Sequence, residues 1–188
     1  MLASLDLRAG TAEGLSVRFY EVAAIRDEIR NLSEEEFSEL RPNPALVIEP
    51  FPEPGSVLRD TTTRVKVQIP SPPPMLHPKA QLVWIVPDAP GKWPAIKLGR
   101  FSTCDIICPN PSVSKVHATL ANYDGIWTVE DHGSTNGTEI SCERIVRSEP
   151  RILPEGEPLV LAQVVVIRAY FSPRSLHAML KTAAIAAA

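Results

Sequence analysis

The chain has 188 residues, 44% of them hydrophobic, and a formal net charge of −3 with acidic and basic residues mixed along its length. This length allows one hydrophobic core, or one core with a smaller satellite, and the mixed charge excludes a global basic field that would recruit nucleic acid or an acidic membrane. The sequence has no run of about 18 apolar residues and no secretory signal at its start, so we expect no membrane insertion. Three cysteines are too few for a disulfide framework, which favours a cytoplasmic location.

The first part of the chain predicts a mixture of short strands and helices. Apolar residues alternate over 15–19, as in a strand, and then follow helical spacing from about residue 21 to residue 40. Ser33 and Glu36 form a capping-box pattern, which indicates either a helix that restarts at Ser33 or two short helices. Two more strands are predicted at 46–48 and 65–69. Residues 1–69 therefore predict an N-terminal region of unknown role, either a small α+β unit or an adaptor that folds against a partner or against the following domain.

Residues 70–78, with the run Pro72-Pro73-Pro74, predict an extended proline-rich linker. Such a segment can also be an SH3-type ligand, but the spacer interpretation is favoured.

After the linker the pattern becomes all-β over residues 79–171. The 19 prolines of the chain also argue against a helical bundle, because each one removes a backbone donor. Residues 172–188 predict a short helix, with Pro173 in its first turn, and a loose tail. The predicted strands lie at 81–86, 95–98, 105–107, 118–122, 126–130, 139–140, 159–161 and 164–171.

Three polar segments separate these strands and are therefore predicted to be loops: 99–100, 114–117 and 133–138. Loops at one end of an antiparallel sandwich can converge on one ligand. Together they offer a guanidinium, hydroxyls, an ammonium and a carboxamide, but no carboxylate base set against a nucleophile. This set suits binding of an oxyanion, so we expect no enzyme activity and no cofactor.

Two catalytic or metal-binding alternatives are disfavoured. Ser114, His117 and Asp131 supply the side chains of a hydrolase triad, but no G-x-S-x-G elbow surrounds the serine. Cys104 and Cys108 could join His117 around zinc, but their spacing is wrong and a fourth ligand is missing, so no metal site is expected.

Gly-Arg, then Ser-x-x-His, then Gly-Ser-Thr-Asn-Gly-Thr, in this order and spacing, resembles the forkhead-associated (FHA) domain over roughly residues 79–171. The resemblance implies a mainly β fold, an eleven-stranded β-sandwich that binds phosphothreonine peptides through loops at one end. The sequence departs from the family pattern at Ser141-Cys142-Glu143, where Asn-Gly is common, and at Ala162, where Gly is common.

The resemblance also implies a role for each motif residue. Those implied to contact the phosphopeptide are Arg100 and Ser114 on the phosphate, Lys115 and Thr135 assisting, and Asn136 on the peptide backbone. Those implied to support the site are His117, which braces the loops, and Gly99, Gly133 and Gly137.

The expected function is a non-catalytic phosphothreonine-reading module in serine/threonine kinase signalling. Its expected partner is a Thr-phosphorylated protein, such as a Ser/Thr kinase or a kinase substrate. The alternative is a scaffold or assembly subunit whose sandwich binds a partner independently of phosphate. Thr61, Thr62 and Thr63 resemble the phosphorylatable threonine that precedes some bacterial FHA domains and folds into their own pocket, but a threonine-rich turn before the strand at Val65 is favoured.

Overall fold

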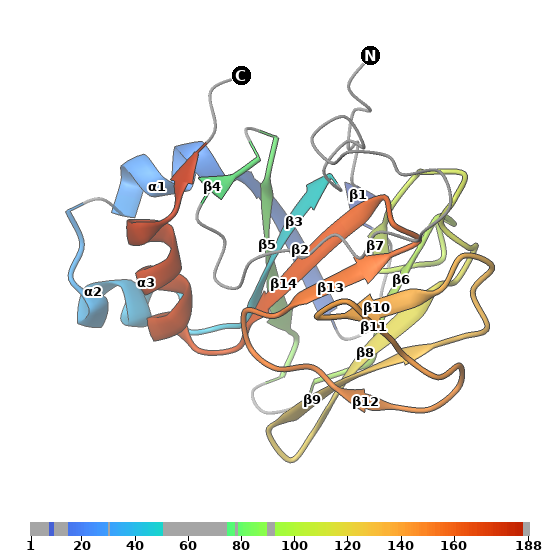
Figure 1. Cartoon of the computed structure of the whole chain (residues 1–188). Coiled ribbons are helices and arrows are strands. Elements are labelled where there is room, and N and C mark those ends of the chain that lie inside the picture. Colours follow the sequence, from blue (N-terminus) through green and yellow to red (C-terminus); the bar gives the residue numbers. More distant parts are fainter. Residues whose placement is uncertain are drawn as a thin grey trace.

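The computed structural model describes residues 8–9, 15–29, 31–50, 75–77, 79–89 and 93–185. Two β-sheets pack face to face, and three helices lie against the outer face of one of them (Figure 1). The six-stranded sheet has the order β1 (Arg8–Ala9), β7 (Ile106–Ile107), β6 (Ile96–Gly99), β8 (Ala118–Tyr123), β9 (Ile126–Asp131) and β12 (Arg151–Ile152). The seven-stranded sheet has the order β11 (Glu143–Arg144), β10 (Thr138–Ile140), β13 (Pro158–Leu161), β14 (Val165–Tyr170), β3 (Ala45–Pro50), β5 (Gln81–Pro87) and β2 (Leu15–Glu21).

The predicted mainly β sandwich is confirmed, and each of the eight strands predicted after residue 79 has a counterpart. The strand number differs from the expected eleven because the two sheets hold six and seven strands in the described part of the chain. The pairs in the sandwich are antiparallel except β6 with β7. A separate parallel pair joins β4 (Met75–Leu76) to β15 (Ala184–Ile185).

The described strands of the N-terminal region lie inside the sandwich, not in a separate unit. β3 lies between β14 and β5, with Ala45 opposite both Tyr170 and Trp84. β2 pairs with β5 along its whole length. Strands from both sides of the proline-rich segment therefore share one sheet. The strand predicted at 65–69 falls outside the described residues.

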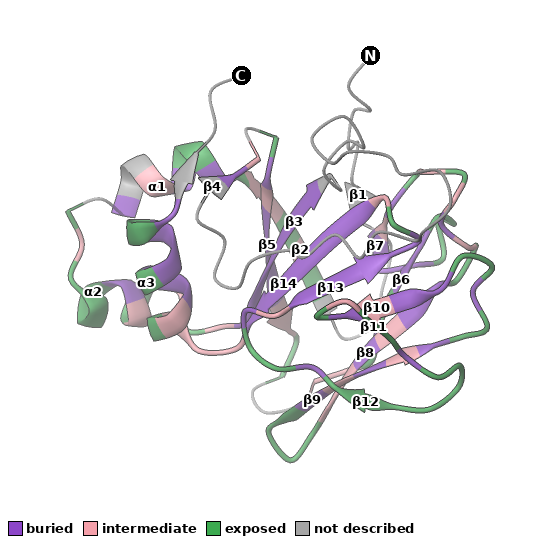
Figure 2. Cartoon of the chain, in the orientation of Figure 1, coloured by how far each residue is buried: buried purple, intermediate pink, exposed green. Residues whose placement is uncertain are grey.

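Both faces of the central strands are buried, which explains why β3, β5 and β14 are almost continuously apolar (Figure 2). Alternate residues point to opposite sides of a sheet. One face packs on the six-stranded sheet, with Leu46, Ile48, Val83, Ile85 and Ile167 among the buried residues. The other face packs on the helices, with Ala45, Val47, Leu82, Trp84 and Tyr170.

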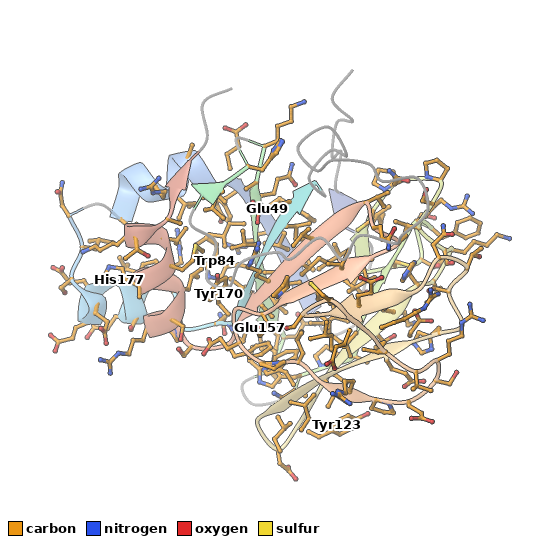
Figure 3. The ribbon with its side chains drawn as sticks, in the orientation of Figure 1. Glu49, Trp84, Tyr123, Glu157, Tyr170 and His177 are labelled. Carbon is orange, nitrogen blue, oxygen red and sulfur yellow. The ribbon has the colours of Figure 1, made fainter. Side chains whose placement is uncertain are left out.

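The helices α1 (Val22–Ile29), α2 (Glu34–Leu40) and α3 (Pro173–Thr182) close this second core. The predicted capping box is confirmed: the Ser33 N–H donates to Glu36 Oε2 at 2.8 Å, and the Glu36 N–H donates to Ser33 Oγ at 3.2 Å. Figure 3 shows Trp84 and Tyr170 between the sheet and the helices, with His177 on α3. None of the helices among the described residues is long and apolar enough to cross a membrane.

Glu49 and Arg168 form a buried ion pair that joins β3 to β14. The Glu49 carboxylate also accepts the N–H of His77, at 2.8 Å, from the segment beside β4. Each of the two buried charges is therefore compensated by the opposite charge of its partner.

Candidate functional site

The three predicted polar loops meet at one end of the sandwich. The Arg100 N–H, just after β6, donates to the carbonyl of Ser114 at 3.0 Å. The Phe101 N–H donates to the carbonyl of Lys115 at 3.1 Å. The Thr135 N–H, in the loop between β9 and β10, donates to Ser114 Oγ at 3.1 Å. Ser114 is therefore hydrogen-bonded to both of the other loops.

Arg100 is exposed, but the base of its side chain is fixed. Its Nε donates to the carbonyl of Val113 at 3.0 Å. Its two terminal amino groups have no hydrogen-bond partner among the described residues. The guanidinium is thus held by one edge while the atoms that make bidentate contacts to anions stay available.

Asn136 is held in a similar way. Its Nδ2 donates to the carbonyl of Ser112 at 2.8 Å, while its Oδ1 accepts no hydrogen bond from the described residues. A carboxamide fixed through its nitrogen presents its oxygen as an acceptor, which is what binding a peptide N–H requires. Ser112 was not predicted, because it acts through its backbone carbonyl.

His117 is fully buried beneath the loops. Its Nδ1 accepts the N–H of Ser114 at 3.1 Å, and its Nε2 lies 3.2 Å from the carbonyl of Gly137. Because Nδ1 accepts, the ring is neutral with its hydrogen on Nε2. Burial lowers the pKa of His117, against the opposing effects of the Gly137 carbonyl and the Asp131 carboxylate.

Asp131, at the end of β9, organises the third loop. Its carboxylate accepts the Ser134 N–H at 2.7 Å, the Ser134 hydroxyl at 2.6 Å and the Thr138 hydroxyl at 2.5 Å. The Gly137 N–H in turn donates to Ser134 Oγ at 2.9 Å. Burial alone would raise the pKa of Asp131, but the hydrogen bonds from Ser134 and Thr138 outweigh it and lower the pKa. An aspartate three residues before a serine was the available signal.

These contacts are not those of a hydrolase triad. His117 contacts the backbone N–H of Ser114, whereas a general base would contact its hydroxyl. The Asp131 carboxylate is engaged by Ser134 and Thr138. Among the described residues, no group of three or more His, Cys, Asp or Glu side chains could hold a metal ion. The Cys104 thiol donates to the Lys115 carbonyl at 3.2 Å, and burial raises its pKa.

Gly99 is required by close approach to the backbone, whereas Gly133 and Gly137 have a positive φ that favours glycine. A Cβ on Gly99 would lie 2.4 Å from the carbonyl oxygen of Lys115, so a larger residue would push the two loops apart. Gly137 has a φ of +86°, and a Cβ there would lie 2.2 Å from Nη2 of Arg144. Gly133 lies in the turn after β9.

Phe101 places an aromatic ring beside two cations. The Lys115 Nζ lies 5.0 Å from the ring centroid, and the Arg100 Cζ lies 5.8 Å from it. The ring is 41% exposed, and sequence reasoning missed it because an aromatic residue after Gly-Arg has no diagnostic spacing. Thr61, Thr62 and Thr63 fall outside the described residues.

Residues 96–162 match the family model of the FHA domain. Only this module is detected, and it is itself non-catalytic. No curated protein matches the chain.

The chain is similar to several solved FHA structures. The MEK1 FHA domain in complex with the HOP1 pThr318 peptide is 23% identical, with 46% of this chain and 87% of that chain covered and a TM-score of 0.39. The FHA domain of an Arabidopsis thaliana hypothetical protein is 18% identical, with 70% of this chain and 89% of that chain covered and a TM-score of 0.44. Mycobacterium tuberculosis EmbR in complex with a low affinity phosphopeptide is 16% identical, with 68% of this chain and 24% of that chain covered and a TM-score of 0.42.

Proposed function

Because the chain contains an FHA domain, we propose that it binds phosphothreonine peptides at the end of the sandwich where the three loops meet. FHA domains typically bind such peptides. The proposed partner is a Thr-phosphorylated protein in serine/threonine kinase signalling, either a kinase or a kinase substrate.

In this proposal the phosphate dianion is bound by Arg100 and Ser114. The two free amino groups of Arg100 donate in parallel to two phosphate oxygens, which is the strongest contact a single side chain offers a phosphate. The Ser114 hydroxyl already accepts the Thr135 N–H, so its own hydrogen is available for a third contact. Lys115 adds a point charge, and the Thr135 hydroxyl adds a donor.

Asn136 is proposed to bind the peptide backbone through Oδ1, the atom that its bond to Ser112 leaves available. His117 and the glycines hold the loops and make no proposed contact with the ligand. The observation that carries the proposal is the pair of bonds at Ser114, from the Arg100 and Thr135 N–H groups, because they bring all three motif loops together before any ligand arrives.

The test compares binding of phosphothreonine peptides with binding of the same peptides without phosphate, by isothermal titration calorimetry. Arg100→Ala should weaken phosphopeptide binding by about 10- to 100-fold, because a charge-assisted contact contributes about 1.5–3 kcal/mol. The matched control is Arg174→Ala, an exposed arginine on α3 that pairs with Glu34, and it should bind like the wild type.

The circular dichroism spectrum of Arg100→Ala should match that of the wild type, since the arginine is exposed. Wild-type affinity in this variant, or equal binding of unphosphorylated peptides, would overturn the proposal. Phosphate-independent binding would instead favour the scaffold alternative.

A further inference from the structure

Arg144 lies against the third loop, although it comes from the next hairpin. Its guanidinium packs over Gly137: a Cβ there would lie 2.2 Å from Nη2, 2.4 Å from Cζ and 2.6 Å from Nε. Only a residue without a side chain leaves room for this contact. Gly137 directly follows Asn136, which places a cation one residue away from the proposed peptide contact.

The position of Arg144 is fixed by its neighbours in the β10–β11 hairpin. Arg144 lies opposite Glu139 in the antiparallel register. The next residue, Ile145, is buried, and its N–H donates to the carbonyl of Thr138 at 3.0 Å. Figure 1 shows β11 running back alongside β10, so this hairpin returns the chain toward the loop that precedes β10.

The charge of Arg144 is not neutralised within the described residues. Glu143 lies 3.7 Å from Arg151 instead, and Glu139 accepts a hydrogen bond from Gln163 at 3.3 Å. Arg144 itself is exposed and makes no ion pair with the described residues. Its charge is therefore available for a ligand.

The surroundings of the three loops are also basic, although the chain as a whole has a net charge of −3. Arg147 donates from Nη2 to the carbonyl of Ser134 at 2.8 Å, on the same loop that Arg144 contacts. Arg100 and Lys115 lie on the other two loops. Asp105 and Asp131, which lie outside the loops themselves, are buried and hydrogen-bonded.

We propose that Arg144 is a second anion contact, which selects phosphothreonine peptides that carry an aspartate or glutamate close to the phosphorylated residue. The inference rests on the proposed function. The guanidinium lies over Gly137, next to the proposed peptide contact Asn136, so a carboxylate close to the phosphothreonine can reach it. A peptide with neutral flanks uses only the phosphate and backbone contacts.

The experiment measures the full chain against two phosphothreonine peptides that differ only in their flanks, Asp and Glu in one and Asn and Gln in the other. The wild type should prefer the acidic peptide by about two- to five-fold at low salt, because an exposed pair contributes about 0.2–1 kcal/mol. Arg144→Gln should abolish this preference and leave the affinity for the neutral peptide unchanged. Arg174→Gln makes the same charge change on α3, away from the loops, and should keep the preference.

A charge reversal provides a second readout. Arg144→Glu should reverse the preference, so that a peptide with lysine flanks now binds better than the acidic one. The inference is overturned if the wild type shows no preference, or if Arg144→Gln and Arg144→Glu keep it. Failure of the proposed function looks different, because phosphorylated and unphosphorylated neutral peptides would then bind alike.

Discussion

Ser114 connects the three loops through different atoms. Its carbonyl accepts the Arg100 N–H, its hydroxyl oxygen accepts the Thr135 N–H, and its own N–H donates to His117. The hydroxyl hydrogen is the one polar hydrogen of Ser114 that these bonds leave available. Replacing Ser114 would also remove a bond between the loops, whereas the terminal amino groups of Arg100 make no hydrogen bond with the described residues, so Arg100 is the cleaner site for a test of binding.

The neutral state of His117 makes stability depend on pH. Since burial lowers the pKa of the folded ring, the unfolded chain binds more protons as the pH falls through about 6.5, the ordinary histidine value. We therefore expect the free energy of unfolding to decrease from pH 8 to pH 5, by about 1.4 kcal/mol for each unit by which the pKa is lowered. Urea unfolding across this range measures it.

His117→Gln should reduce this pH dependence, whereas His132→Gln should keep it, because His132 is exposed. Asp131 does not interfere in this range: its pKa is lowered, so the stability it contributes is lost only as the pH falls below about 3.9. An unchanged slope in His117→Gln would contradict the assignment of a buried neutral ring.

At the scale of single elements, the sequence predicts those helix caps and turns whose signal lies in neighbouring residues. The capping box at Ser33 was found because its signal lies within four residues, and Asp124 and Gly125 form a turn with positive φ at both residues. Two other turns were not predictable as such: Ser141 and Cys142, and then Ala162 and Gln163, adopt positive φ without glycine. The first turn joins the paired strands β10 and β11 and the second joins β13 and β14, and no local pattern shows this pairing.

The candidate site likewise contains residues that the sequence predicts and residues that only the folded structure reveals. The motif residues are predicted from their order in the chain. Phe101 and Arg144 gain their contacts with Lys115 and Gly137 only when separate loops or hairpins pack together, so no spacing in the sequence announces them. Such residues need coordinates before they can be included in a site.

The capping box offers a test at this scale. Ser33→Ala removes the side-chain acceptor of the Glu36 N–H and should lower the free energy of unfolding by about 1 kcal/mol. Phosphopeptide affinity should stay the same, because α2 packs on the helix-covered face of the sheet. The matched control is Ser38→Ala within the same helix, where alanine is the better helix former and no cap is lost. Equal losses of stability in the two variants would argue against the cap.

At the scale of the whole molecule, the order of strands in the seven-stranded sheet shows which segments belong to the sandwich, and the order of segments in the chain does not. The segment before the proline-rich stretch looked separable because composition changes sharply there. Yet β3 lies between β14 and β5, and β2 extends the same sheet. The pairing partner of a strand depends on residues far away in the chain. The apolar run at 46–48 could pair with many different strands.

A variant that begins at residue 79 is therefore expected not to fold. It lacks Leu46, Val47 and Ile48, which are buried between the two cores, and each loss of a large buried side chain costs about 2–5 kcal/mol. It also lacks Glu49, the carboxylate partner of Arg168. These losses approach or exceed the roughly 5–15 kcal/mol that stabilises a typical domain.

Urea unfolding and phosphopeptide titration measure the outcome. The shortened chain should show no cooperative transition and no binding. A variant that begins at residue 15 keeps β2 and β3 and should unfold cooperatively. If residues 79–188 alone gave a cooperative transition and bound phosphopeptide like the full chain, β3 would be dispensable. Because β14 and β5 both pair with β3, their pairing edges would then need another partner.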